Sequence, residues 1–269
     1  LDAIDVAGEW SNMLGTAVTW AINDRMDLES GYEFGKRRSL EDAFSSIDQD
    51  WNTASFRWRY TDGATLAGGL ETMISGTSYE DPIRNDAKSI SGGLFASWTP
   101  SDYTSVFGSI GLQEFQFEDS FARSGSRHTG VYGALGISNQ LNDAFRHTLS
   151  IGRGSQLSDL ADYTENSYIR YGLDWDATDA TRFNGYVSYN RSQEGGARRN
   201  ESLESVRFGL TLSQKLTDHL TLGLGGHHSN YESNLTARDY SEWRGQAWLS
   251  ACQRRLKHHR LIRTLAHPW

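Results

Sequence analysis

The side chains of this chain that could carry out chemistry are charged residues placed at every second position of apolar runs. In residues 168–176, Arg170 and Asp174 alternate with Ile169, Tyr171 and other apolar side chains. The same alternation predicts one polar face that carries nine charged residues: Glu29, Glu33, Arg57, Arg59, Glu71, Arg170, Asp174, Arg207 and Arg244. On the wall of an aqueous pore, such residues would set ion preference and orient water and solutes. Alternatively, the arginines and acids pair with one another and stiffen the wall, and the sequence leaves both possibilities open.

Motifs for catalysis do not occur in the sequence. It contains no G-x-S-x-G elbow, no H-E-x-x-H, no phosphate-binding glycine loop and no C-x-x-C pair. A single Cys excludes a disulfide within the chain. We therefore expect a protein that is not an enzyme and that needs no cofactor and no metal.

The amino-acid composition excludes further classes of protein. The 269 residues are 37% hydrophobic, 12% aromatic and 22% charged, with only 3 Pro and a net charge of −8. This aromatic content argues against disorder, and the acidic balance argues against nucleic acid as a partner. No run of eighteen apolar residues occurs, so we expect no transmembrane helix.

Along most of the chain apolar residues recur at every second position, a period of two. This pattern predicts strands with one apolar and one polar face. Most runs have ten to thirteen residues, which suits tilted strands that cross a bilayer better than strands of a soluble sheet. Thirteen runs are predicted: 10–20, 26–36, 51–61, 64–78, 88–99, 103–118, 127–140, 144–154, 167–177, 181–192, 203–215, 219–230 and 239–250.

The connections between these runs alternate between short and long. Each short connection contains Asn, Asp, Gly, Thr or Pro, as in 61–63 and 141–143, and the long ones, such as 37–50, are polar. Short turns at one end and long loops at the other are typical of an outer-membrane β-barrel. A repeat near forty residues also occurs in β-propellers, but a propeller blade has four short strands where this repeat has two long ones.

These patterns predict an all-β fold, a closed antiparallel transmembrane barrel with an up-and-down meander of about 14 strands, or 12 as the fallback. Thirteen runs and an even strand number imply one further strand, for which residues 1–9 are a remnant or a substitute. Five Trp residues near strand ends fit interfacial girdles, although ordinary sheet packing also explains them: Trp20, Trp51, Trp98, Trp175 and Trp243, the last lying deeper.

Residues 1–250 are expected to form a single barrel domain, followed by a basic tail at 251–269. The tail contains Cys252 and several Arg, Lys and His residues, and no acid. It is either an artefact, such as a translated frameshift, or a periplasmic segment that contacts an anionic partner.

Four stretches of the chain resemble the β-barrel porin 2 family of bacterial outer-membrane proteins: 136–142, 147–153, 166–173 and 238–249. The resemblance implies an outer-membrane barrel with a transport or structural role and no catalytic residues. The tail after Ser250 departs from the family pattern.

We therefore expect a porin-like channel in the outer membrane of a Gram-negative bacterium, through which ions or small hydrophilic solutes diffuse along a charged lumen. Its partners would be outer-membrane lipid, these solutes and a periplasmic or complex partner protein, without nucleic acid. Two alternatives remain: a structural or export barrel with no open pore, which would scaffold a polysaccharide or a protein, and a soluble β-repeat binding module.

Overall fold

The computed structural model consists of one antiparallel sheet of thirteen strands, the number that the sequence predicts. It describes residues 9–40, 48–81, 84–119, 125–158, 161–196, 201–235 and 238–251. The strands are β1 (Glu9–Asn23), β2 (Met26–Ser39), β3 (Gln49–Thr61), β4 (Leu66–Tyr79), β5 (Ala87–Ser101), β6 (Thr104–Phe117), β7 (Arg127–Asn142), β8 (Phe145–Leu157), β9 (Tyr163–Asp176), β10 (Thr181–Gly195), β11 (Ser202–Thr217), β12 (Leu220–Ser233) and β13 (Tyr240–Ala251).

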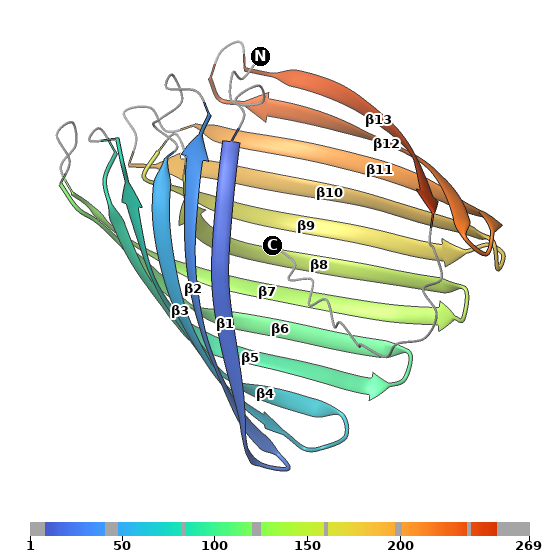
Figure 1. Ribbon diagram of the computed structural model, residues 1–269, viewed down its shortest axis with the longest axis horizontal. Coiled ribbons are helices and arrows are strands. Elements are labelled where there is room, and N and C mark those ends of the chain that lie inside the picture. The colour runs from blue at the N-terminus through green and yellow to red at the C-terminus, as the bar shows by residue number, and fades with distance from the viewer. Residues whose placement is uncertain are drawn as a thin grey trace.

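Each strand pairs only with its neighbours in sequence, so the sheet is an up-and-down meander from β1 to β13. Figure 1 shows the sheet strongly curved, with β1 and β13 at its two edges. In the described residues no pairing joins β1 to β13, so the predicted closure into 14 or 12 strands is not confirmed. Of the residues expected to provide the missing strand, 1–9, residues 1–8 lie outside the described residues and Glu9 begins β1; the basic tail after Ala251 also lies outside them.

Turns and loops alternate as predicted, with short turns at one end of the strands and longer loops at the other (Figure 1). The β3–β4 turn shows how the short connections form. The Asp62 carboxylate accepts hydrogen bonds from the backbone amides of Ala64, Thr65 and Leu66, at 2.8 to 2.9 Å. Gly63 takes a φ of 86°, a left-handed conformation that glycine adopts without strain. Asp62 therefore determines where β4 begins.

The two faces of the sheet differ in character, as period two predicts. One face carries large apolar side chains that are open to the surroundings, such as Leu94 at 56%, Ile110 at 60% and Leu210 at 59% exposed. By contrast, the described residues contain only five buried hydrophobic residues: Ala87, Phe115, Phe117, Ala161 and Tyr231. A sheet with so small a core and so large an exposed apolar face is suited to an apolar solvent, which a lipid bilayer provides.

The opposite face is the concave one. The Tyr132 hydroxyl of β7 donates a hydrogen bond to Glu71 of β4 at 3.2 Å, although two strands lie between them. Side chains of strands three apart meet in this way only on the inside of a curved sheet. Small polar side chains are also crowded there, with Ser229 1% and Ser205 5% exposed.

Four of the five tryptophans predicted for interfacial girdles lie on the apolar convex face. Trp20, Trp98 and Trp175 lie on this face near the short turns, and Trp243 lies deeper on β13. Trp51 is the exception, because it pairs with Gly35 on the concave face and donates a hydrogen bond from Nε1 to Glu33 at 3.1 Å. It therefore belongs to no lipid-facing girdle. In the described ranges, no helix has the length and apolar character needed to span a membrane.

Candidate pore-lining face

All nine charged residues that the sequence assigns to one face lie on the concave face of the sheet. Residues directly opposite in an antiparallel pair point to the same side. Glu29 lies opposite Arg57, and Arg57 lies opposite Glu71. The register then continues strand by strand to β13, and it puts the full set on one side: Glu29, Glu33, Arg57, Arg59, Glu71, Arg170, Asp174, Arg207 and Arg244.

On the first part of this face, from β2 to β4, the two predicted arginines are each paired with a carboxylate, whereas Glu29 and Glu33 have no ion pair with a described residue. Arg57 Nη2 lies 2.9 Å from Glu71 Oε2, and Arg59 Nη2 lies 2.6 Å from Asp27 Oδ2. Both arginines are about half exposed, so each pair contributes only about 0–1 kcal/mol to stability. Here the pairing that the sequence left as an alternative is the observed arrangement.

Arginines on β9 and β11 are held differently. The Arg170 guanidinium lies over the Tyr186 ring at 4.6 Å, and that of Arg207 lies over the Tyr231 ring at 5.2 Å. Within the described part of the chain, neither has a carboxylate at ion-pair distance. Asp174, the nearest predicted acid on β9, instead accepts a hydrogen bond from Asn184.

The last predicted residue, Arg244 on β13, has a carboxylate partner. Arg244 Nη2 lies 2.9 Å from Glu242 Oε2 on the same strand. Of the nine predicted residues, Arg170 and Arg207 are thus the arginines whose charge is not used in an ion pair with a described residue.

Aromatic rings that lie over glycines are a second feature of the concave face, and the sequence analysis did not identify it. Each ring belongs to a residue directly opposite a glycine, so that a Cβ on the glycine would come within 2.6 Å of a ring atom. The pairs are Trp51 with Gly35, Phe107 with Gly136, Tyr132 with Gly111, Tyr168 with Gly152, Tyr186 with Gly209 and Trp248 with Gly223.

These pairs keep large side chains flat against the wall. A ring that stood upright would extend into the space that the curved sheet surrounds, whereas a ring over glycine occupies the volume of the missing side chain. Tyr132 shows this best, because its ring crosses Gly111, and its hydroxyl oxygen, 2.5 Å from a Cβ built on Gly93, donates to Glu71. The arrangement leaves space over the concave face while still covering the backbone.

A polar recess of about 340 Å³ opens on the concave face near the loops. It is lined by Arg37, Gln49, Trp51, Thr53, Ser75, Thr77, Tyr79, Gln156 and Leu157. Because β8 supplies the last two residues, side chains from distant strands converge there. Hydroxyl, amide and guanidinium groups beside two aromatic rings could hold a polar solute by hydrogen bonds and stacking.

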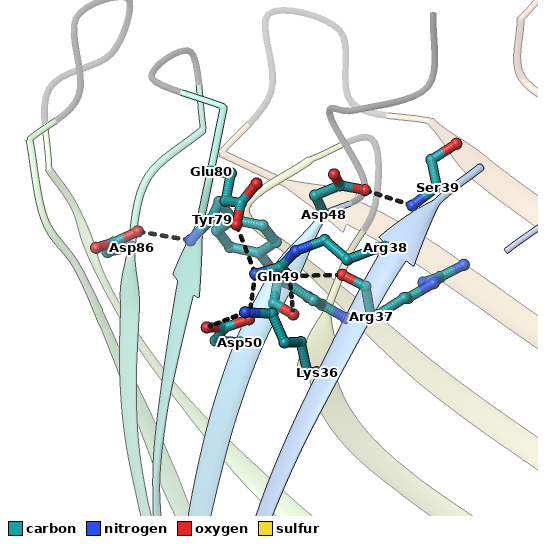
Figure 2. A network of polar contacts seen from close by, with 10 residues as sticks. All are labelled: Lys36, Arg37, Arg38, Ser39, Asp48, Gln49, Asp50, Tyr79, Glu80 and Asp86. Carbon is teal, nitrogen blue, oxygen red and sulfur yellow. Dashed lines mark hydrogen bonds and ion pairs between the residues drawn. The ribbon is translucent and has the colours of Figure 1, made fainter. Parts of the chain in front are cut away.

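An ion-pair network fixes the backbone beside this recess (Figure 2). Arg38 lies between Asp50 and Glu80, with nitrogen to oxygen distances of 2.6 and 2.5 Å. Its Nη1 also donates to the backbone carbonyls of Arg37 and Gln49, at 2.7 and 2.9 Å. One guanidinium thus connects the loop ends of β2, β3 and β4, and Arg37, Gln49 and Tyr79 point into the recess from the opposite side of the same strands.

The antiparallel meander of long strands, the apolar convex face and the polar concave face together define the fold of bacterial outer-membrane β-barrel proteins. Solved structures of this class match the chain. The copper transporter OprC has a TM-score of 0.61 at 11% identity, covering 86% of this chain and 47% of that chain. The FrpB iron transporter from Neisseria meningitidis has a TM-score of 0.58 at 10% identity, covering 86% and 45%.

A third match is the alcaligin outer-membrane receptor FauA from Bordetella pertussis, with a TM-score of 0.56, 12% identity, and 84% and 47% coverage. The chain spans less than half the length of these solved chains. Their likeness confirms the predicted outer-membrane fold. No family model matches the chain, that of the porin 2 group included, and no curated protein matches it, so membership of that family stays a prediction.

Proposed function

We propose that the sheet forms part of the wall of an outer-membrane barrel through which ions or small hydrophilic solutes diffuse along a charged lumen. The observation that carries this proposal is the separation of faces, with nine charged residues on the concave side and exposed apolar residues on the convex side. Charged groups on the inside of a curved transmembrane sheet supply the polar surface that a water-filled passage needs.

The convex face favours this proposal over a soluble β-repeat module. Leu94, Ile110 and Leu210 would all face water in a soluble protein, together with most other convex residues at the same depth. Exposure of these apolar side chains to water is unfavourable. A lipid bilayer avoids this exposure, because apolar side chains need no further partner in hydrocarbon.

Single-channel recording tests the proposal. The full chain is refolded into lipid vesicles, its β-structure is verified by circular dichroism, and it is transferred to planar bilayers. We expect discrete, ohmic conductance steps. A folded, inserted protein that conducts at no voltage would contradict passive diffusion and support the structural or export barrel, in which case a stable copurifying protein or polysaccharide is expected.

A second candidate is solute-specific uptake, which two observations favour. The matched solved proteins are an iron transporter, a copper transporter and an alcaligin receptor. This chain also carries a polar recess at the loop end of its concave face, where an arriving solute would first meet it. Saturable uptake into vesicles without ohmic steps would support this candidate and contradict the first.

A further inference from the structure

We propose that Arg170 and Arg207, with Ser188 between them, form a binding site for a small oxyanion on the concave face. The ligand class is a phosphate group, or a carboxylate group of an organic solute. The site rests on the proposed function, because it would act on solutes that move along this face, and it specifies which charge they carry.

The register brings these residues into one row across the sheet. Arg170 lies opposite Ser188, and Ser188 lies opposite Arg207. The full row on β8 to β12 is Ser150, Arg170, Ser188, Arg207 and Ser229. Two strand spacings separate the arginine backbones by about 10 Å, a span that two long side chains can bridge around one anion. Ser188 between them is only 8% exposed, so an anion would lie above this side chain, between the two guanidinium groups.

The positive charges of Arg170 and Arg207 are not neutralised by a described acidic residue, so they can bind an anion. Three other arginines of the concave face are used in ion pairs, Arg57 with Glu71, Arg59 with Asp27 and Arg244 with Glu242. In the portions of the chain that are described, no carboxylate lies at ion-pair distance from Arg170 or Arg207. A guanidinium without an acidic partner is the group that binds phosphate and carboxylate by paired hydrogen bonds.

An aromatic ring covers one face of each guanidinium group, and the two rings lie on opposite sides of the row. Arg170 lies over Tyr186, whose ring is itself held against Gly209, and Arg207 lies over Tyr231, which stacks on Tyr240 at 4.3 Å. A guanidinium that lies over a ring has its face covered while the N–H groups at its edge remain free to donate. Because Tyr186 is opposite Gly209 and Tyr231 is opposite Ser205, the two guanidinium groups must leave these rings to close on one anion.

Titration calorimetry of the full chain, folded in detergent, tests the site independently of conductance. The probes are inorganic phosphate, acetate and, as a neutral control, glycerol. We expect phosphate to bind the unmodified protein and R170Q/R207Q to bind it at least about tenfold more weakly. Stronger binding of acetate than of phosphate would identify the carboxylate as the preferred group.

Two further double variants test whether phosphate binding depends on the charge of the two arginines or on the planar shape of the guanidinium group, and whether it depends on the position of the charge. R170K/R207K keeps both charges but lacks the planar fork, so phosphate affinity should fall between those of the unmodified protein and R170Q/R207Q. K88Q/R191Q removes the same charge from the convex face, where Lys88 and Arg191 are 70% and 58% exposed, and should bind phosphate normally. Circular dichroism verifies that each variant is folded.

Conductance then distinguishes the two proposals. If phosphate binding is lost in R170Q/R207Q but the unmodified protein does not conduct, the site stands and passive diffusion fails. If the protein conducts but R170Q/R207Q binds phosphate as the unmodified protein does, or K88Q/R191Q is weakened equally, the anion site is overturned. In a conducting protein, R170Q/R207Q should also shift the reversal potential in a KCl gradient toward cation preference.

Discussion

In the described strands, the six glycine–aromatic pairs given above for the concave face each depend on the absence of a Cβ on the glycine. At the scale of the residue, we therefore expect the loss of stability in a glycine-to-alanine variant to depend on which glycine is replaced. Tyr186 lies between two glycines in its row, Gly172 on β9 and Gly209 on β11, but its ring covers only Gly209.

We predict that G209A destabilises the protein and that G172A does not. A Cβ at position 209 would lie 2.5 Å from Tyr186 Cε1, whereas one at 172 would meet only the Gly185 carbonyl oxygen, at 3.8 Å. The displaced ring should make G209A less stable by about 1–3 kcal/mol, as overpacking does elsewhere. Urea unfolding in lipid vesicles measures the difference, and equal midpoints for the two variants would contradict the ring placement.

At the scale of the element, the hairpin turns determine where each strand begins. Hydrogen bonds from the amides of Leu66 and Ala64 lower the pKa of the Asp62 carboxyl below its ordinary value of 3.8. A carboxyl group whose folded pKa is depressed stabilises the protein above its unfolded pKa. That stabilisation is lost as the pH falls through the folded pKa.

We therefore predict that D62A is less stable than the unmodified protein near neutral pH, and that the difference shrinks as the pH falls below the ordinary aspartate range. D102A is the matched control, since Asp102 lies in the β5–β6 turn and Ser101, not Asp102, accepts the bond from the Tyr103 amide there. Denaturant midpoints measured across pH provide the comparison. A deficit in D62A that persists unchanged in acid would show that its carboxylate is not the cause.

Strand number, order and face were predictable because period two is a local property of the chain. Residues 54–60 already assign Arg57 and Arg59 to one face, and extending that parity to Trp51 would have placed it on the polar side. The glycine–aromatic pairs were not predictable, because they depend on which residue of one strand lies opposite which residue of the next. The recess was beyond prediction for the same reason, since Gln156 and Thr53 come from strands that are distant in the sheet.

At the scale of the whole molecule, a bilayer around the convex face is the condition on which the fold depends. Adjacent residues on one strand test this directly, because Ser109 and Ile110 of β6 point to opposite faces. Ile110 is 60% exposed on the apolar side, in the middle of its strand.

We predict that I110R is far more disruptive than S109R. An arginine near the bilayer midplane costs about 2–4 kcal/mol, whereas one on the concave side keeps contact with water. Folding yield and urea midpoint in vesicles of defined thickness measure both variants. Equal effects would place both faces in similar surroundings and contradict the membrane assignment.

The odd number of strands constrains how the wall can be completed. In an alternating meander of thirteen, β1 and β13 run in the same direction. A seam between these two strands would be parallel, and two such sheets related by a twofold axis along the membrane normal would meet at two parallel seams. Whatever fills the gap between β1 and β13 in a fully antiparallel cylinder must therefore contribute one strand, three, or another odd number.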